Sequence, residues 1–156
     1  MSQYAAKTDV PSDRTRTEIE RTLRRYNATA FAYGWQNGAA TIGFTVANRS
    51  VRVELPLPSP GDRQFANGPS GRARTAAGAE QAYEQAVRQR WRALALVIKA
   101  KLEAVEAGIS TVEREFLADV LLPDGRTVGA WAGPQLALVY ERGGVPALLP
   151  GVSDRG

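Results

Sequence analysis

Seven arginines have the charge and spacing for one kind of chemistry, the neutralisation of phosphate groups. They fall in three clusters along the chain: Arg21, Arg24 and Arg25, then Arg72 and Arg74, then Arg88 and Arg92. The guanidinium group is always charged, and its planar fork of donors matches the geometry of phosphate oxygens. We therefore take these seven side chains as the candidate nucleic-acid-binding residues.

The net charge of +4 is unevenly distributed along the sequence. Residues 1–92 hold 14 Lys and Arg against 8 Asp and Glu, whereas residues 93–156 hold 6 against 8. A basic front half indicates a surface for a polyanion, although a solvated arginine-rich surface without a partner explains the same composition. No helix-turn-helix, zinc-finger or RNA-recognition signature occurs, so binding would use the phosphate backbone and not the bases.

The sequence excludes several classes of enzyme, because it contains no histidine and no cysteine. Serine–histidine and cysteine–histidine nucleophile systems are ruled out, as are metal sites that need imidazole or thiolate ligands. Neither the phosphate-loop signature nor the dinucleotide-binding signature is present. One acidic group is dense enough to suggest Mg²⁺, but it is typical of a solvated helix face: Glu103, Glu106, Glu113, Glu115 and Asp119. We predict a non-enzymatic protein with no metal or other cofactor.

The first half of the chain predicts a helix followed by a three-stranded antiparallel meander. A helix over residues 13–26 places Ile19, Leu23 and Tyr26 on one face, and residues 15–18 form a capping-box pattern at its start. Strands are expected over residues 29–36, 39–47 and 50–57. The first two are joined by a turn at Asn37-Gly38 and the last two by a turn at Asn48-Arg49.

These two turns predict the register of the strands. The first places Phe31 opposite Phe44, Tyr33 opposite Ile42 and Trp35 opposite Ala40. The second places Ile42 opposite Leu55, Phe44 opposite Val53 and Val46 opposite Val51. Both registers put the apolar side chains on one face of the sheet, which supports the pairing. The alternating aromatic row of residues 31–35 is then either part of a core or a platform for stacked bases. The surrounding Ile and Val residues favour the core.

The second half of the chain predicts a long loop and a long helix. Residues 56–74 are rich in Pro, Gly and Arg and are expected to form a flexible loop. A helix over residues 76–107 follows, ended by Gly108. Its core stripe contains Tyr83, Val87, Trp91, Leu94, Ile98, Leu102 and Val105, and a basic stripe contains Arg88, Arg92 and Lys99. Residues 94–98 are apolar on nearly every side, so either the C-terminal segment or a second copy should cover them.

The C-terminal part predicts short elements only. A capping box over residues 110–113 starts a short helix, a turn at residues 122–126 closes a small hairpin, and Gly133-Pro134 opens a final helix. Residues 1–11 are expected to be a loose arm and residues 145–156 an irregular tail. The whole chain, residues 1–156, is predicted to be a single domain. Its fold class is α+β: an N-terminal helix, a three-stranded antiparallel meander, one long helix packed on the sheet and a small helical C-terminal part.

The sequence resembles a family of uncharacterised proteins encoded by bacteriophages and prophages. The resemblance rests on QAYEQAVRQRWRALALVIKAKLEAVEAGISTVEREFLADVLLPDGRTVGAW at residues 81–131, on Tyr4-Ala5 with Thr8, and on Tyr33-Gly34-Trp35. The family has no assigned activity and no known catalytic residues. The resemblance therefore implies only a setting inside a bacterial host cell, where short non-enzymatic proteins commonly handle nucleic acid or bind a host protein.

Two functional hypotheses follow from the sequence. The first is a phage-type accessory protein that binds nucleic acid, with DNA favoured over RNA, in replication, recombination or their control. The alternative is a protein-binding module that inhibits or modulates a host or defence protein. The N-terminus has no apolar leader and no apolar run is long enough to cross a membrane, so we expect a cytoplasmic protein without a membrane partner. A homo-oligomer formed through the long helix is compatible with both hypotheses.

Overall fold

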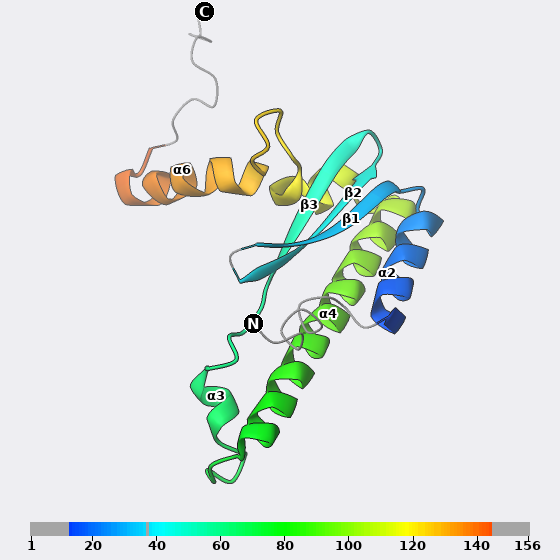
Figure 1. The fold of residues 1–156 in the computed structure, drawn as a ribbon. Coiled ribbons are helices and arrows are strands. Elements are labelled where there is room, and N and C mark those ends of the chain that lie inside the picture. Colours follow the sequence, from blue (N-terminus) through cyan, green and yellow to red (C-terminus); the bar gives the residue numbers. More distant parts are fainter. Residues whose placement is uncertain (1–12, 37, 145–156) are drawn as a thin grey trace, which may run out of the picture.

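The computed structural model describes residues 13–36 and 38–144, which form an α+β fold (Figure 1). The expected loose arm at residues 1–11 and the expected tail at residues 145–156 lie outside the described residues. The elements in chain order are α2 (Asp13–Arg25), β1 (Thr29–Gln36), β2 (Ala39–Val46), β3 (Arg49–Pro56), α3 (Arg63–Ala66), α4 (Ala76–Glu106), α5 (Val112–Glu115), the 3-10 helix η1 (Leu117–Asp119) and α6 (Val128–Arg142). The predicted order of a helix, three strands and a long helix is confirmed.

The three strands form an antiparallel sheet in the order β1-β2-β3. The predicted β1–β2 register is confirmed, since Phe31 pairs with Phe44 and Tyr33 with Ile42. A bulge at the start of β1 accompanies Ala30, whose φ of 50° is unusual for a residue with a side chain. Asn37 lies outside the described residues, and Gly38 after it has a φ of 76°.

The predicted β2–β3 register is wrong by two residues, because the turn lies one residue earlier than expected. Ala47 and Asn48 occupy the turn with φ angles of 47° and 60°, and Val46 pairs with Arg49. Such a turn needs positive φ at both central residues, which Asn tolerates much better than Arg. The observed pairs are Ala40 with Leu55, Ile42 with Val53 and Phe44 with Val51. A shift of two residues keeps every side chain on its predicted face.

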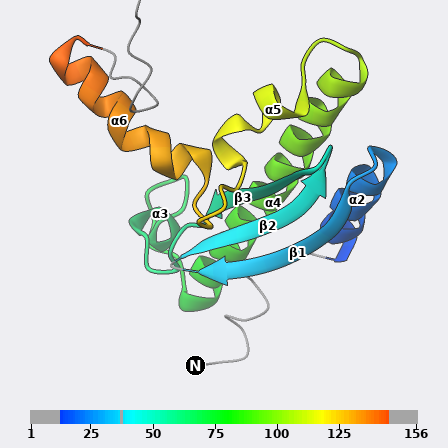
Figure 2. The same ribbon diagram turned by 90° about the horizontal axis from the view of Figure 1, so that it is seen from above.

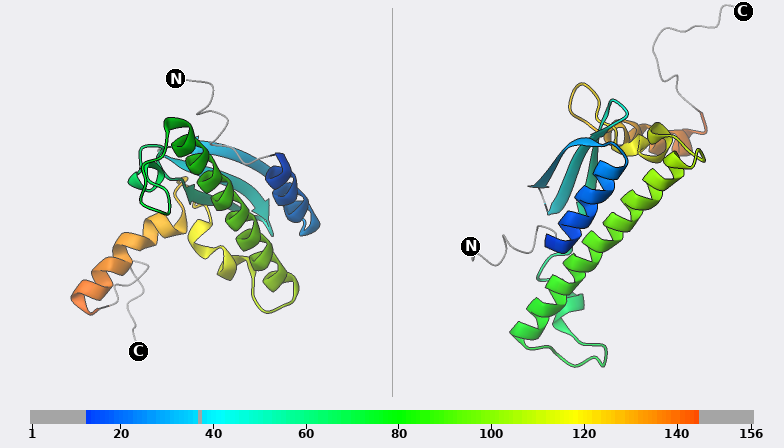
Figure 3. Two further views of the ribbon diagram at one scale, coloured as in Figure 1. Left: turned by 90° about the horizontal axis from the view of Figure 1, so that it is seen from below. Right: turned by 90° about the vertical axis from the view of Figure 1, so that its right-hand side faces the viewer.

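Helices α2 and α4 lie side by side against one face of the sheet, and the core is between them (Figures 1 and 3). Ile19 and Leu23 of α2, Ile42 of β2, and Trp91 and Ile98 of α4 are at most 1% exposed. The expected capping box of the first helix is wrong, because Thr15 and Glu18 both lie inside α2, which already includes Asp13.

The aromatic row of β1 faces the same side as this core, as predicted, but it is buried unequally. Phe31 and Tyr33 are half-buried and pack against the core, and the Tyr33 and Trp91 rings meet edge to face at 6.1 Å. Trp35 is 54% exposed near the end of the strand. On the opposite face of the sheet, Ala32 and Gly34 are exposed.

Helix α4 follows the predicted boundaries closely. Thr75 caps its first turn by accepting a hydrogen bond from the Gly78 backbone N–H, and Gly108 beyond its end has a φ of 73°. The predicted core stripe is buried or packed against the core. However, Leu96 is 64% exposed and Val97 is 47% exposed. The sequence analysis expected either the C-terminal segment or a second copy to cover this part of α4. The described part of the C-terminal segment does not cover Leu96 and Val97.

Residues 56–74 contain ordered structure that the sequence analysis did not predict. Phe65 of α3 is 4% exposed, and its ring meets Tyr83 of α4 edge to face at 5.6 Å. A backbone bridge joins Asn67 to Ala73. The predicted loop therefore contains a short helix that one buried aromatic side chain anchors to α4, and its flexibility stays a prediction.

The C-terminal part is attached to the outer edge of β3. Val120 forms an antiparallel bridge with Val51, and the predicted small hairpin is confirmed by a bridge between Leu121 and Thr127. The capping residue of α5 is Thr111, one residue later than expected. Helix α6 starts five residues before the predicted Gly133-Pro134, because the Thr127 hydroxyl accepts from the Ala130 backbone N–H and caps it there.

Candidate nucleic-acid interface

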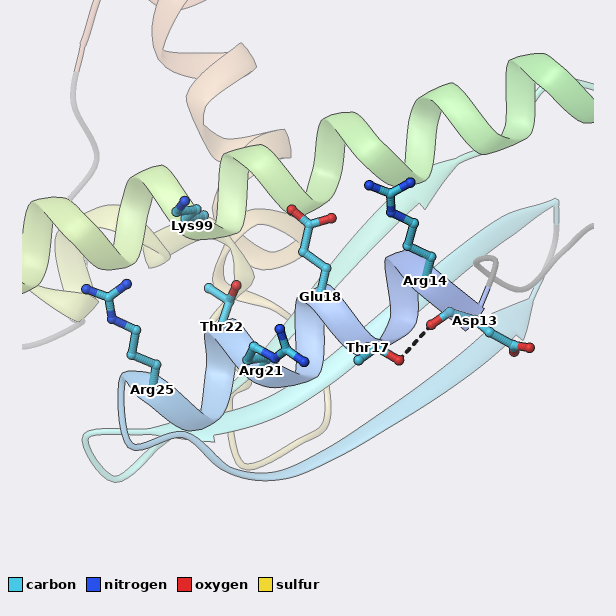
Figure 4. Close-up of a pocket in the computed structure, with 8 residues that line it drawn as sticks. All are labelled: Asp13, Arg14, Thr17, Glu18, Arg21, Thr22, Arg25 and Lys99. Atoms are coloured by element: carbon cyan, nitrogen blue, oxygen red, sulfur yellow. Dashed lines mark hydrogen bonds between the residues drawn. The ribbon is translucent and has the colours of Figure 1, made fainter.

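A groove between α2 and α4, with a volume of about 660 Å³, gathers four cationic side chains around one space (Figure 4). Its cations are Arg14, Arg21 and Arg25 of α2 and Lys99 of α4, and its two carboxylates are Asp13 and Glu18. Thr17 and Thr22 complete the lining. The cations outnumber the carboxylates, so the groove favours an anion.

The periodicity of α2 places the arginines in this groove. Thr15, Ile19 and Leu23 form the buried stripe of the helix. Residues 14, 18, 21 and 25 are spaced by four, three and four positions, so they form the neighbouring stripe along the same helix. Figure 4 shows the side chains of Arg14 and Glu18 reaching toward α4. The burial of an apolar stripe therefore determines where the charged stripe lies.

On α4, a basic stripe runs from Lys99 toward the start of the helix. Arg92 and Arg88 are exposed and precede Lys99 by seven and eleven residues, which are two and three turns of the helix. Helices α2 and α4 run in the same direction, with their N-terminal ends at the same end of the molecule (Figures 1 and 3). The stripe therefore runs in the direction of the start of α2, and about 16 Å of helix separates Arg88 from Lys99.

Most of these cations are not neutralised by the protein itself. Within residues 13–36 and 38–144, Arg14, Arg21, Arg92 and Lys99 form no ion pair. Arg88 lies 3.9 Å from a Glu84 carboxylate oxygen, but its side chain is 54% exposed, and such surface pairs are weak and easily exchanged for another anion. The cationic groups are therefore available to a ligand.

The structure brings some of the seven predicted arginines together and separates the others. Arg21 and Arg25 line the groove, whereas Arg88 and Arg92 lie outside its lining, on the stripe of α4 that contains Lys99. Arg24 lies on another face of α2, where its guanidinium carbon is 5.7 Å from the centre of the Phe31 ring.

Arg72 and Arg74 lie at the far end of α4, where residues 67–75 precede the helix. About 35 Å of helix separates its start from Lys99. Arg74 donates hydrogen bonds to the carbonyl oxygens of Gln64 and Phe65, so its guanidinium group holds the α3 segment in place. This role differs from the expected phosphate contact, because the group already has acceptors inside the protein. Arg72 is exposed.

Two groove cations are absent from the seven predicted residues, namely Arg14 and Lys99. Both carry a signal in the sequence. Arg14 precedes Arg21 by seven residues and Arg25 by eleven, which places all three on one helix stripe. Lys99 shares the stripe of Arg88 and Arg92. The sequence does not show that the stripe of Arg14 on α2 and the stripe of Lys99 on α4 face the same groove.

The acidic residues do not form a metal site in the described part of the chain, where no three potential metal-ligating side chains cluster together. Glu113 instead pairs with Arg49 at 2.9 Å. Asp119 ends the 3-10 helix, where burial raises the pKa of its carboxyl, Lys101 opposes this effect and Glu54 adds to it. Glu103, Glu106 and Glu113 are exposed, as expected of a solvated face, whereas Glu115 and Asp119 are only partly exposed.

Comparison of the chain with protein families, curated proteins and solved structures finds no match. Among the described residues, no helix combines the length and the apolar character needed to span a membrane. The groove itself is therefore the basis for any functional conclusion.

Proposed function

We propose that this protein binds nucleic acid by placing the phosphate backbone in the groove between α2 and α4. The observation that carries the proposal is the convergence of Arg14, Arg21, Arg25 and Lys99 on one groove. Arginine neutralises phosphates and displaces their condensed counterions, which provides affinity without reading the sequence. The resemblance to phage-encoded proteins supports an accessory role in replication, recombination or their control, with DNA favoured over RNA.

The two carboxylates in the groove also bear on the mode of binding. Asp13 and Glu18 repel a phosphate placed next to them, so a strand crossing the groove would contact the cations on either side of Glu18. Replacing Glu18 by Gln should therefore strengthen binding, whereas loss of Arg21 should weaken it. A larger gain from Glu18→Gln than from Glu141→Gln, which makes the same charge change at an exposed residue of α6 outside the groove, would indicate a defined path and not a diffuse attraction to positive charge.

The test is fluorescence anisotropy with labelled single-stranded DNA, duplex DNA and RNA, titrated at several salt concentrations. We expect the logarithm of the binding constant to fall linearly with the logarithm of salt concentration. The double substitution Arg21→Glu and Arg25→Glu should weaken binding about a hundredfold, because each lost phosphate contact is replaced by a repulsion.

A matched control is Arg114→Glu, because Arg114 is exposed on α5, on the other side of α4 from the groove (Figure 2). It changes the net charge as each groove substitution does, so it should weaken binding only slightly. Equal losses from Arg21→Glu and Arg114→Glu would argue against the groove. The absence of binding to all three nucleic acids at low salt would refute the proposed function.

The alternative, a protein-binding module, is favoured by a different observation. Leu96 of α4 and Tyr140 of α6 are 64% and 84% exposed, and exposed apolar surface marks protein interaction sites. Under this alternative the groove arginines would be dispensable. A pull-down from host lysate that captures one protein with the wild type and with the Arg21→Glu variant, but not with Leu96→Glu, would support it.

A further inference from the structure

A second cavity, of about 340 Å³, lies beside the cationic groove, where the ends of α2 and α4 approach each other (Figures 1 and 3). Its lining comes from the end of α2, the connection from α2 to β1, the turn between β2 and β3, the end of α4 and the start of α5. Arg25 lines both the groove and this cavity, so the two spaces are neighbours. We call the cavity the end pocket.

The helical spacing of α4 places the end pocket in line with the groove. Lys99 lines the groove, and Leu102 and Glu106 line the end pocket. These two residues follow Lys99 by three and seven positions, so all three lie on one stripe of the helix. About 10 Å of helix separates Lys99 from Glu106. A strand that follows the groove along α4 therefore reaches the end pocket next.

The end pocket has mainly apolar walls, whereas the groove is lined by charged side chains. Three polar residues, Tyr26, Asn27 and Glu106, share the pocket with an apolar set: Val46, Ala47, Leu102, Val105 and Val112. Apolar walls with a few polar groups are typical of a small-molecule site, and the volume is near the lower limit of about 300 Å³ for such sites. The end pocket therefore suits one ring-sized group.

Tyr26 gives the end pocket an aromatic ring beside a cation. The guanidinium carbon of Arg25 lies 5.4 Å from the centre of this ring. The Tyr26 hydroxyl is buried and has no hydrogen-bond partner of normal geometry within the described chain. Burial raises the pKa of this phenol, Arg25 opposes the effect, and Glu103 and Glu106 add to it. Proteins that hold single strands combine cations for the phosphates with aromatic rings on which the bases stack.

The charges of the two spaces separate a phosphate from a base. Arg25 attracts a phosphate at the boundary between them, whereas Glu106 repels one inside the end pocket. A nucleobase is neutral and has apolar faces, so it can enter where the phosphate cannot. Bases in a duplex are paired and stacked, and extruding one costs free energy. An unpaired base therefore fits this arrangement better than a duplex does.

We propose that the end pocket holds one unpaired nucleobase of a strand whose phosphates lie in the groove, so that the protein binds single-stranded nucleic acid more tightly than duplex. This inference rests on the proposed function, because it requires the phosphate backbone in the groove. Arg25 contacts the phosphate next to the bound base, and the Tyr26 ring contacts the base.

The proposal is tested by competition anisotropy with the full-length protein, using a single strand and a blunt-ended duplex that carry the same number of phosphates. The wild type should bind the single strand more tightly at the same salt concentration. A mononucleotide distinguishes a strand from a free nucleotide as the ligand. It should compete poorly, because it supplies one phosphate to a groove with several cations. Strong competition at micromolar concentration would indicate a nucleotide site and overturn the proposal.

Two variants change the end pocket without changing its charge. Tyr26→Leu removes the aromatic ring, and Val105→Trp fills the cavity. Each should weaken single-strand binding about tenfold, because the contact between base and ring is lost. Each should leave duplex binding unchanged, which also checks that the variant is folded. Tyr83→Leu is the matched control, because Tyr83 is a half-buried tyrosine of α4 that lines neither space.

Photo-crosslinking of the wild type to a single strand that contains iodouracil gives a second readout, independent of the variants. Mass spectrometry should locate the crosslink at Tyr26. Equal affinity for single strand and duplex, pocket variants that bind the single strand as the wild type does, or crosslinks only outside the end pocket would each overturn the inference. The proposed function would survive these results if Arg21→Glu still weakened binding to both nucleic acids, so the two failures are distinguishable.

Discussion

The guanidinium carbon of Arg16 lies 4.8 Å from the centre of the Tyr33 ring, and this contact joins α2 to β1 at the edge of the sheet. Arg16 lies on a different side of α2 from the groove arginines, and it also approaches Glu20 at 3.8 Å. The first helix therefore uses its arginines in two ways. One set faces the groove, and the other packs on aromatic rings of β1.

The contact between Arg16 and Tyr33 should contribute measurably to stability. A double-mutant cycle with Arg16→Ala and Tyr33→Leu should give a coupling free energy of about 0.5–1 kcal/mol, the usual range for a cation over an aromatic ring. Urea unfolding of the four proteins measures it. Glu20→Ala is the control and should change stability by less than about 0.5 kcal/mol, because the ion pair is long, at 3.8 Å, and its arginine is exposed. A coupling of zero would contradict a cation–π contribution.

Lys99 should contribute to the salt dependence of nucleic-acid binding as one phosphate contact. Lys99→Ala should reduce the slope of the logarithm of affinity against the logarithm of salt concentration by about one. Anisotropy titrations at four or more salt concentrations measure this slope. Lys101→Ala, which changes the charge equally two residues along the helix, should leave the slope unchanged, because Lys101 donates to the Glu115 carbonyl instead of facing the groove.

Asp119 should make the protein less stable as the pH rises from acid to neutral. Burial raises the pKa of this carboxyl above its ordinary value of 3.8. The folded state therefore holds the proton more tightly than the unfolded state. The associated stabilisation is fully present below pH 3.8 and is lost as the pH rises through the folded-state pKa.

Asp119→Asn should remove this pH dependence, because the amide cannot ionise. We expect the variant to match the wild type at low pH and to exceed its stability at neutral pH by less than about 1 kcal/mol, since the site is only half-buried. Chemical unfolding between about pH 3 and pH 7 measures the difference. A wild type whose stability relative to the variant increased with pH would contradict this prediction.

Two glycines of α6 should respond in opposite ways to substitution by alanine. A methyl group added at Gly133 would meet no atom within 4 Å, so Gly133→Ala should stabilise the helix by about 1 kcal/mol. Gly129→Ala should instead be destabilising, because its Cβ would lie 3.3 Å from the Ala118 Cβ and closer still to the Ala118 carbonyl oxygen. Amide hydrogen exchange in α6 measures both, and equal protection in the two variants would argue against the close contact.

Substitutions in the turn between β2 and β3 should increase the stability of the protein. Ala47 has a φ of 47°, a left-handed conformation that costs about 1 kcal/mol for a residue with a Cβ. Replacement of Ala47-Asn48 by Asn-Gly provides the pair that this turn type prefers and should raise the free energy of unfolding by about 1 kcal/mol. Thermal unfolding measures the gain. The single substitution Asn48→Gly, at a φ of 60°, is the control that shows how much of the gain comes from Ala47.

Much of the fold could be predicted from the sequence because its determinants are local. The alternation of apolar residues in β2 and β3 fixes which face each side chain occupies, and this prediction survived an error of two residues in the register. The length of α4 follows from an uninterrupted helical pattern between Thr75 and Gly108. The predicted helix boundaries were wrong where a single side chain determines the boundary. For example, Thr127 caps α6, so the helix begins before Pro134.

For the candidate site, the sequence predicts some features and only the tertiary structure shows the others. The sequence by itself determined that the arginines of α2 and α4 lie in stripes, because helical periodicity places residues three and four apart on one face. Only the tertiary structure decided that Lys99 and Arg21 face the same groove and that Arg74 is held by the carbonyl oxygens of α3. The packing of two helices on a sheet depends on contacts between residues far apart in the chain, and no local pattern specifies such contacts.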